Sequence, residues 1–201
     1  YAGAASSAKE GSAIAIAAAI NKASDATGVT ATANENVVEG STTADPGLSA
    51  GATGQLQING VTIAMTVQGS AEENRAYAVS QINSISGQTG VTAEDNGEGL
   101  TLTAADGRNI AIGIDTNATA NGGNGLSADM LGLNESAVSE ADVTNGDAAV
   151  FTTTYSTVSL ESGGKFTVSG GENGNAALES LGFEAGTYGG AETGQRLTEV
   201  D

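Results

Sequence analysis

The chain has 201 residues, a formal net charge of −18 and neither histidine nor cysteine. So acidic a chain repels phosphate backbones and anionic lipid surfaces, which argues against nucleic-acid and membrane partners. The missing residue types exclude disulfides, thiol nucleophiles, Ser-His-Asp triads and the usual zinc sites. No stretch reaches the roughly 18 apolar residues that a membrane-spanning helix needs.

The first part of the chain predicts a helix followed by a strand. Ile16 and Ile20 lie four residues apart and indicate a helix over residues 8–25, which Gly28 would end. Residues 29–34 alternate small apolar residues with threonine, a pattern typical of a strand. Residues 39–54 contain the only proline and many turn-forming residues, so we predict a linker or long loop there.

A hairpin and a second helix come next. Apolar residues alternate over residues 56–67, interrupted by Asn59-Gly60, a pair that suits a two-residue hairpin turn. Residues 71–86 predict a helix with Ala78, Ile82 and Ile85 on one face. A second strand is expected to follow that helix.

The remaining elements are shorter. Two more hairpins are predicted, one pairing Leu100 and Leu102 with Ile110, Ile112 and Ile114, the other pairing Val158 and Leu160 with Phe166 and Val168. Between them we expect a loop over residues 115–125 and a short helical turn over residues 128–133. A short helix over residues 175–181 would end at Gly182.

One segment of the chain is repeated. Ile20-Asn21, Ser24 and the run Thr27 to Ala31 recur as Ile82-Asn83, Ser86 and the run Thr89 to Ala93, always 62 residues later. A weaker echo links residues 130–133 with residues 180–183. Constant spacing over a helix, a turn and a strand indicates a duplicated supersecondary unit.

The repeat and the weaker similarity together predict an α+β fold made of two similar small domains, each with antiparallel strands and one main helix. One domain would be discontinuous and proximal, formed by residues 1–47 plus 142–201. The other, residues 48–141, would be inserted into it and distal. Insertion at an exposed loop is tolerable because loop-closure entropy grows slowly with loop length.

These residues resemble the central, variable region of bacterial flagellin. Residues 55–61, the helix ending in Ile82-Asn83, the run Thr89 to Ala93 and residues 100–107 look like the flagellin and hook-associated repeat named after its Ile-Asn pair. Residues 20–31 look like a second, partial copy, and residues 180–201 are similar to the return toward the C-terminal helices. The resemblance covers about two thirds of the chain, and we expect the chain to be an internal piece without the polymerising terminal helices.

The resemblance implies a structural role in the extracellular flagellar filament, supporting motility. Other flagellin subunits would be partners through regions missing here, host or surface molecules are further possible partners, and the isolated piece would be a monomer. The alternative is an extracellular adhesin or glycan-binding module, for which Tyr77, Tyr155 and Tyr188 are the modest candidates.

No catalytic, cofactor-binding or metal-binding residue is predicted, so the chain is expected to be no enzyme. We interpret the acidic pairs Glu72-Glu73 and Glu94-Asp95 as solvated surface. Residues 95–99 lack the spacing of an EF-hand loop, and the glycine-rich residues 122–125 and 170–174 lack the lysine of a phosphate loop; all three are read as turns. Asn117 and Asn134 match N-glycosylation sequons, and such matches are mostly coincidence in a bacterial protein. Asn21 and Asn83 are expected to support the following turn through side-chain hydrogen bonds.

Overall fold

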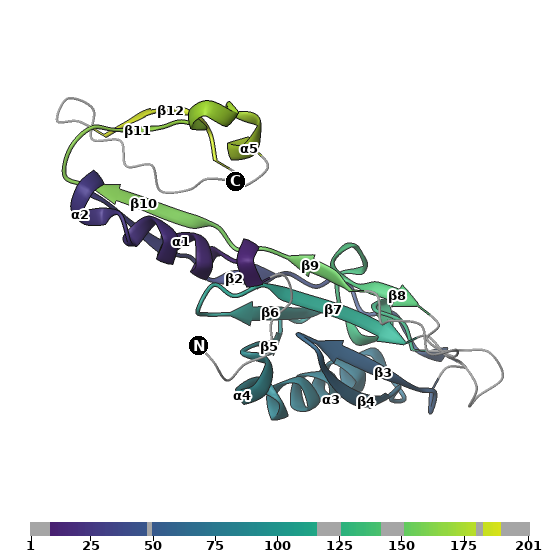
Figure 1. Ribbon diagram of the computed structural model, residues 1–201. Helices are drawn as coiled ribbons and strands as arrows, with labels where there is room; N and C mark the ends of the chain where they lie inside the picture. Colours follow the sequence, from purple (N-terminus) through teal and green to yellow (C-terminus); the bar gives the residue numbers. More distant parts are fainter. Residues whose placement is uncertain (1–8, 48–49, 116–125, 142–150, 180–182, 190–201) are drawn as a thin grey trace. The chain divides into compact units, whose positions relative to one another are not determined.

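The computed structural model describes residues 9–47, 50–115, 126–141, 151–179 and 183–189 (Figure 1). It combines helices with mostly antiparallel strands, which confirms the predicted α+β class. The described residues form two compact units. Unit 1 comprises residues 36–105 and 109–154, and unit 2 comprises residues 9–35, 106–108 and those from 155 onward. The assignment of residues 1–47 plus 142–201 and 48–141 to a proximal and a distal domain stays a prediction.

Unit 1 contains a three-stranded and a five-stranded sheet. Their order is β2-β6-β5 and β4-β3-β7, with β8 and β9 both on the far edge of β7. The β7–β8 pair is parallel, and the other pairs are antiparallel. The elements are β2 (Asn36–Val38), β3 (Thr53–Ile58), β4 (Val61–Thr66), α3 (Ala71–Ser84), α4 (Ser86–Thr89), β5 (Thr92–Asp95), β6 (Leu100–Ala104), β7 (Ile110–Asp115), η3 (Asp129–Leu131), η4 (Glu135–Ala137), β8 (Ser139–Ala141) and β9 (Thr152–Thr154).

Unit 2 is built around one helix and two separate strand pairs, β1 with β10 and β11 with β12. Its core is small and consists mainly of alanine and valine with Leu160 and Phe183. The elements are η1 (Lys9–Gly11), α1 (Ala13–Asn21), α2 (Ser24–Thr27), β1 (Val29–Ala33), β10 (Val158–Ser162), β11 (Phe166–Val168), η5 (Gly171–Asn173), α5 (Ala176–Glu179) and β12 (Gly186–Tyr188).

The predicted hairpin at Asn59-Gly60 is confirmed. Ile58 pairs with Val61 across the turn, and both central residues have positive φ, +50° at Asn59 and +82° at Gly60. This conformation suits the twist of the paired strands. Asn59 also fixes the hairpin to the rest of unit 1. Its Oδ1 accepts from the amide of Ala111 in β7 at 2.9 Å, and its Nδ2 donates to the carbonyl of Thr89 at 3.0 Å.

The strand with Leu100 and Leu102 does not pair with the strand of residues 110–114, so that predicted hairpin is wrong. Both edges of β6 are occupied, one by β2 and the other by β5. β7 pairs instead with β3 on one edge and with β8 and β9 on the other. All its residues from Ile110 to Ile114 are buried, as expected of a central strand covered on both faces. The turn at residues 105–109 therefore carries the chain from one sheet to the other.

The second predicted hairpin, between Val158 or Leu160 and Phe166 or Val168, is also wrong. β10 pairs with β1, from Ala33↔Val158 to Val29↔Ser162, and β11 pairs with β12. The glycines at 163 and 164 link two strand pairs instead of closing one, because each strand finds a partner elsewhere in the chain.

The helices predicted over residues 8–25, 71–86 and 128–133 are present with shorter bounds, and α5 lies within the helix predicted over residues 175–181, the end of which is outside the described residues. The segment 8–25 contains α1 and η1, and Gly28 ends the following turn in the left-handed conformation. In the predicted loop of residues 39–54, the described residues before Thr53 form no strand, whereas Thr53 and Gly54 belong to β3. The predicted loop beyond residue 115 and Gly182 lie outside the described residues. No helix among the described residues is long and apolar enough to cross a membrane.

Candidate functional site

The two Ile-Asn motifs carry the same local construction. In unit 2, Nδ2 of Asn21 donates to the carbonyl of Ala31 at 2.8 Å, and Oδ1 of Asn21 accepts from the Ala31 amide at 2.7 Å. In unit 1, Asn83 makes the same two bonds to Ala93, at 2.9 and 2.8 Å. Each side-chain amide thus pairs with a strand residue ten positions later. This confirms the predicted structural role of both asparagines.

The turn between the asparagine and its strand is also duplicated. Ser24 and Ser86 each donate to the carbonyl of their asparagine at 2.8 Å. The hydroxyls of Thr27 and Thr89 each accept from the amide two residues later at 3.2 Å. Each turn ends at a glycine with positive φ, because an L side chain in this left-handed conformation is strained.

The duplication extends to a strand pairing that sequence reasoning missed. Ala31 in β1 lies opposite Leu160 in β10, as Ala93 in β5 lies opposite Leu102 in β6. The matched threonines, Thr30 and Thr92, each donate to a carbonyl on that opposite strand at 3.4 Å. β10 is therefore the counterpart of β6. Its alternation of apolar and polar residues predicts the strand but does not specify its partner.

The weaker similarity, between residues 130–133 and 180–183, is accompanied by one matching hydrogen bond in each unit. The Leu133 amide donates to the carbonyl of Ala128, and the Phe183 amide donates to the carbonyl of Leu178, both at 2.9 Å. Leu133 and Phe183 are both buried, each in the core of its own unit. Residues 180–182 lie outside the described part of the chain.

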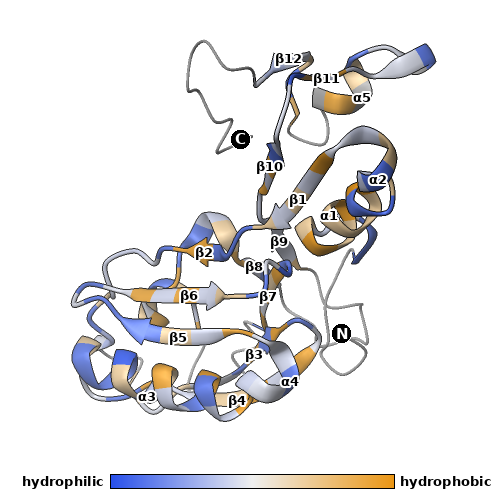
Figure 2. Ribbon diagram, turned by 90° about the vertical axis from the view of Figure 1, so that its left-hand side faces the viewer, coloured by the Kyte–Doolittle hydropathy of each residue, from blue (hydrophilic) through white to orange (hydrophobic). Residues whose placement is uncertain are grey.

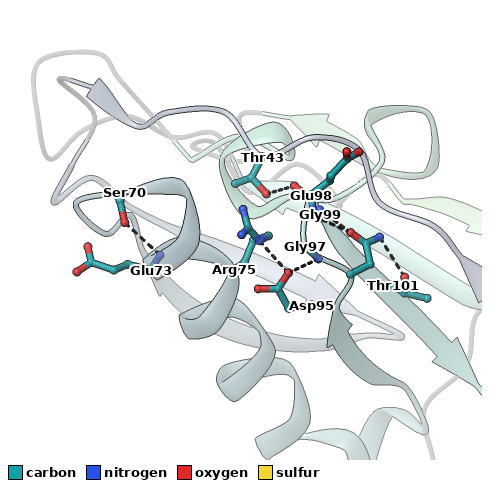
Figure 3. Close-up of polar contacts among 10 residues, drawn as sticks. Thr43, Ser70, Glu73, Arg75, Asp95, Gly97, Glu98, Gly99 and Thr101 are labelled. Carbon is teal, nitrogen blue, oxygen red and sulfur yellow. Dashed lines mark hydrogen bonds and ion pairs between the residues drawn. The ribbon is translucent and has the colours of Figure 1, made fainter.

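The acidic residues do not converge on a site among the described residues. Glu72, Glu73 and Glu94 are exposed, and no group of three potential metal ligands gathers in the described part. Asp95 has an ion pair with Arg75 at 2.9 Å, and its Oδ1 also accepts from the Gly97 amide at 2.8 Å (Figure 3). Oδ1 of Asp95 thus joins α3 to the β5–β6 turn.

The remaining residues of that turn hold the backbone. Oδ1 of Asn96 accepts from the amides of Glu98 and Gly99 at 3.0 and 2.7 Å. The carbonyl of Glu98 accepts from the Thr43 hydroxyl at 2.8 Å, as Figure 3 shows. These bonds confirm that residues 95–99 form a hairpin turn, between β5 and β6.

The three tyrosines lie in different surroundings. Tyr77 packs against the core of unit 1, and Tyr188 contacts Phe166 with ring centroids 5.7 Å apart. Tyr155 is 52% exposed. The side chains of Tyr77 and Tyr188 are thus engaged in packing, which leaves Tyr155 as the exposed ring of the three.

Two further candidate positions also have structural contacts. Asn134 of the second sequon accepts from the Ser136 amide at 3.0 Å, and its Nδ2 donates to the carbonyl of Glu39 at 3.2 Å. Residues 171–173 form a short helical turn, η5. Asn117 and residues 122–125 lie outside the described residues.

One carboxyl has a perturbed acidity. The side-chain hydrogen bonds from Arg108 hold the pKa of Asp106 below its usual range, against the opposing effect of partial burial. The same bonds raise the pKa of Arg108. This pair belongs to the turn between β6 and β7.

Comparisons with known proteins agree with the resemblance to flagellin. No protein-family model matches the chain. It is 38% identical to Flagellin A of Helicobacter felis over 98 residues, which are 48% of this chain and 18% of that protein. It is 37% identical to Flagellin A of Helicobacter mustelae over 116 residues, 57% of this chain and 22% of that protein. The chain thus spans about a fifth of the length of the curated relatives it matches. Over about half of its own length, this is a flagellin-like chain, as its Ile-Asn motifs predicted.

Proposed function

We propose that this chain forms the outer, solvent-facing domains of a structural subunit of the bacterial flagellar filament, outside the cell, where it supports motility. The observation that carries the proposal is the duplicated Ile-Asn unit in a chain similar to two proteins named Flagellin A. We infer a structural and not an enzymatic role.

The contacts of the duplicated unit support a building role. The amides of Asn21 and Asn83 are used in bonds to the backbone of their own strands, and the matched serines and threonines are used in the turns. Groups engaged in this way stabilise the fold.

The charge of the chain supports an outward-facing position. A net charge of −18 keeps such domains hydrated and makes neighbouring copies repel each other. We therefore propose that subunits join through regions outside this chain and that the 201-residue chain alone is a monomer. Sedimentation of the purified chain should give one monomeric species, and filaments seen by electron microscopy would contradict this.

The location can be tested in the source bacterium. An epitope inserted between Gly163 and Gly164, both exposed and with open space beside them, should leave unit 1 and the β1–β10 pair undisturbed. Immunogold electron microscopy should then label intact filaments along their whole length, with the untagged strain as the control. Filaments without label, in cells that produce the tagged protein, would refute the proposed location.

A further inference from the structure

A segment of unit 1 that belongs to no strand connects two of its distant turns. Residues 39–47, which we call the clasp, run from the end of β2 toward β3. The amide and the hydroxyl of Thr43 both donate to the carbonyl of Glu98, at 2.7 and 2.8 Å, and Figure 3 shows the hydroxyl bond. The Ala44 amide donates to the carbonyl of Asp129 at 3.0 Å. The clasp therefore bonds to the β5–β6 turn and to η3 at once.

Three glycines let these segments approach each other closely. A Cβ atom on Gly99 would lie 2.1 Å from the carbonyl oxygen of Ser41, and one on Gly40 would lie 2.2 Å from the carbonyl oxygen of Gly132. A Cβ atom on Gly132 would lie 2.5 Å from the Thr43 hydroxyl oxygen. Separations this short are far below van der Waals contact. Any side chain at these positions would therefore push the clasp away from the turns.

The clasp is held by polar contacts and not by apolar burial. None of its nine residues, all of them described, belongs to the apolar cluster of unit 1, and its buried residues are Thr43 and Pro46. The turn that it contacts is hydrophilic as well, and it appears in blue at the end of β5 in Figure 2. Hydrogen bonds are directional, whereas apolar burial is not. The clasp can therefore bond only when its partners already have their final geometry.

These partners are distant in sequence but are themselves formed locally. The Thr43–Glu98 bond spans 55 residues, and the bond from the Ser41 hydroxyl to the Leu133 carbonyl spans 92. The two turns, in contrast, are closed by short-range bonds, from the amide of Asn96 to the carbonyl of Gly99 and from the amide of Leu133 to the carbonyl of residue 128. Distant contacts cost more chain entropy than local ones and tend to form later.

We propose that the clasp is a kinetic lock of unit 1, which closes after the rest of the unit has folded and must open before the unit can unfold. Contacts that are absent from the folding transition state slow unfolding and leave the folding rate unchanged. The chain has no cysteine, so the clasp connects remote segments without a disulfide. The lock is a property of unit 1 alone, and it does not depend on the filament role proposed above.

Replacing Gly99 tests the lock in the 201-residue chain. Gly99 does not have positive φ, so Gly99→Ala adds only the Cβ atom that collides with the clasp. Rapid transfer into and out of urea, with pulsed hydrogen exchange read at α3 and β7, gives the unfolding and refolding rates of unit 1. Unfolding should become about tenfold faster, whereas refolding should change by less than about twofold.

Gly87→Ala is the matched control. Gly87 lies in α4, also has no positive φ, and has open space where the Cβ atom would be. Alanine favours a helical conformation over glycine, so this substitution should not accelerate unfolding.

A milder pair of substitutions keeps the test decisive if Gly99→Ala does not fold. Thr43→Val keeps the shape of the buried side chain and removes only its hydroxyl bond to Glu98. It should accelerate unfolding about fivefold, the equivalent of one hydrogen bond, and leave refolding unchanged. Thr42→Val, at the exposed neighbouring position, should change neither rate.

Two results would overturn the proposal. Slower refolding with an unchanged unfolding rate would show that the clasp closes before the folding barrier is crossed. Unfolding by Thr43→Val that is no faster than unfolding by Thr42→Val would show that the clasp does not hold unit 1 closed.

Discussion

The side-chain amides of Asn83 and Asn21 bond to a strand residue in the way that a neighbouring β-strand would. A side-chain amide carries an N–H donor and a C=O acceptor on the same side, as one residue of a β-strand does, so it can bond to both the carbonyl and the amide of one strand residue. Aspartate has no donor for the carbonyl. The residue type therefore follows from the bonds that it makes, and no ligand is needed to explain its presence in both units.

Replacing Asn83 tests this reading. Asn83→Ala removes two hydrogen bonds to Ala93, and because Asn83 is exposed we expect a loss of about 1–2 kcal/mol in the free energy of unfolding. Asn83→Asp should lose at least as much, since a carboxylate oxygen would face the Ala93 carbonyl in place of the donor and a negative charge would stand at the C-terminal end of α3. Urea denaturation gives both values. Ser80→Ala, at an exposed position of the same helix, is the control and should change the free energy of unfolding little. If Asn83→Ala changed it no more than Ser80→Ala does, the assigned role of Asn83 would be contradicted.

The pair Asp106–Arg108 predicts a pH effect. The hydrogen bonds from Arg108 lower the pKa of Asp106 in the folded protein, so the ionised carboxyl stabilises the fold above its unfolded pKa, near 3.8. This contribution is lost as the pH falls through the lower, folded pKa. Asp106→Asn should therefore be less stable than the parent chain at pH 7, and the difference should shrink below about pH 4.

Comparing the two proteins at each pH removes the general effect of neutralising so acidic a chain. Chemical denaturation at pH 7 and pH 3 measures the difference. A difference that stays constant between these two pH values would show that the ion pair does not contribute.

At the scale of elements, sequence patterns predicted the hairpin between adjoining strands and missed the strand pairs formed by residues far apart in the chain. The Asn59-Gly60 turn fixes its own hairpin, because a two-residue turn with positive φ brings the adjoining strands together. Residues 105–109 and the glycines at 163 and 164 look like hairpin turns too, but their strands pair elsewhere. The uninterrupted apolar run of β7 was the available sign of a central strand. Nothing in the short, alternating β10 indicates that its partner lies near residue 31.

The matched strands β6 and β10 allow a like-for-like test of the two cores. Leu102 is enclosed by the core of unit 1, so Leu102→Ala should cost about 3 kcal/mol through lost burial and a cavity. Leu160 borders an open apolar groove of about 770 Å³ beside α1, so its removal widens a space that solvent already reaches, and Leu160→Ala should cost clearly less. Hydrogen exchange of each unit measures the loss. Equal costs would mean that the groove is closed in solution.

For the whole molecule, the duplication explains how one unit is split along the chain. In unit 1 a short turn, residues 96–99, joins β5 to β6. In unit 2 the matching connection between β1 and β10 contains all the elements of unit 1. A long insertion in a turn adds little closure cost, because that cost rises only with the logarithm of loop length.

The core of unit 1 predicts that this unit folds alone. Every member of its apolar cluster, from Val38 to Val138, lies within residues 36–154. Residues 36–154 expressed by themselves should therefore unfold in one cooperative transition, with a free energy within about 1 kcal/mol of that of unit 1 in the full chain. Circular dichroism during urea unfolding, with hydrogen exchange of α3 and β7, makes the comparison. A disordered fragment would show that unit 2 is needed to fold unit 1, and the two would then be one cooperative domain despite their separate cores.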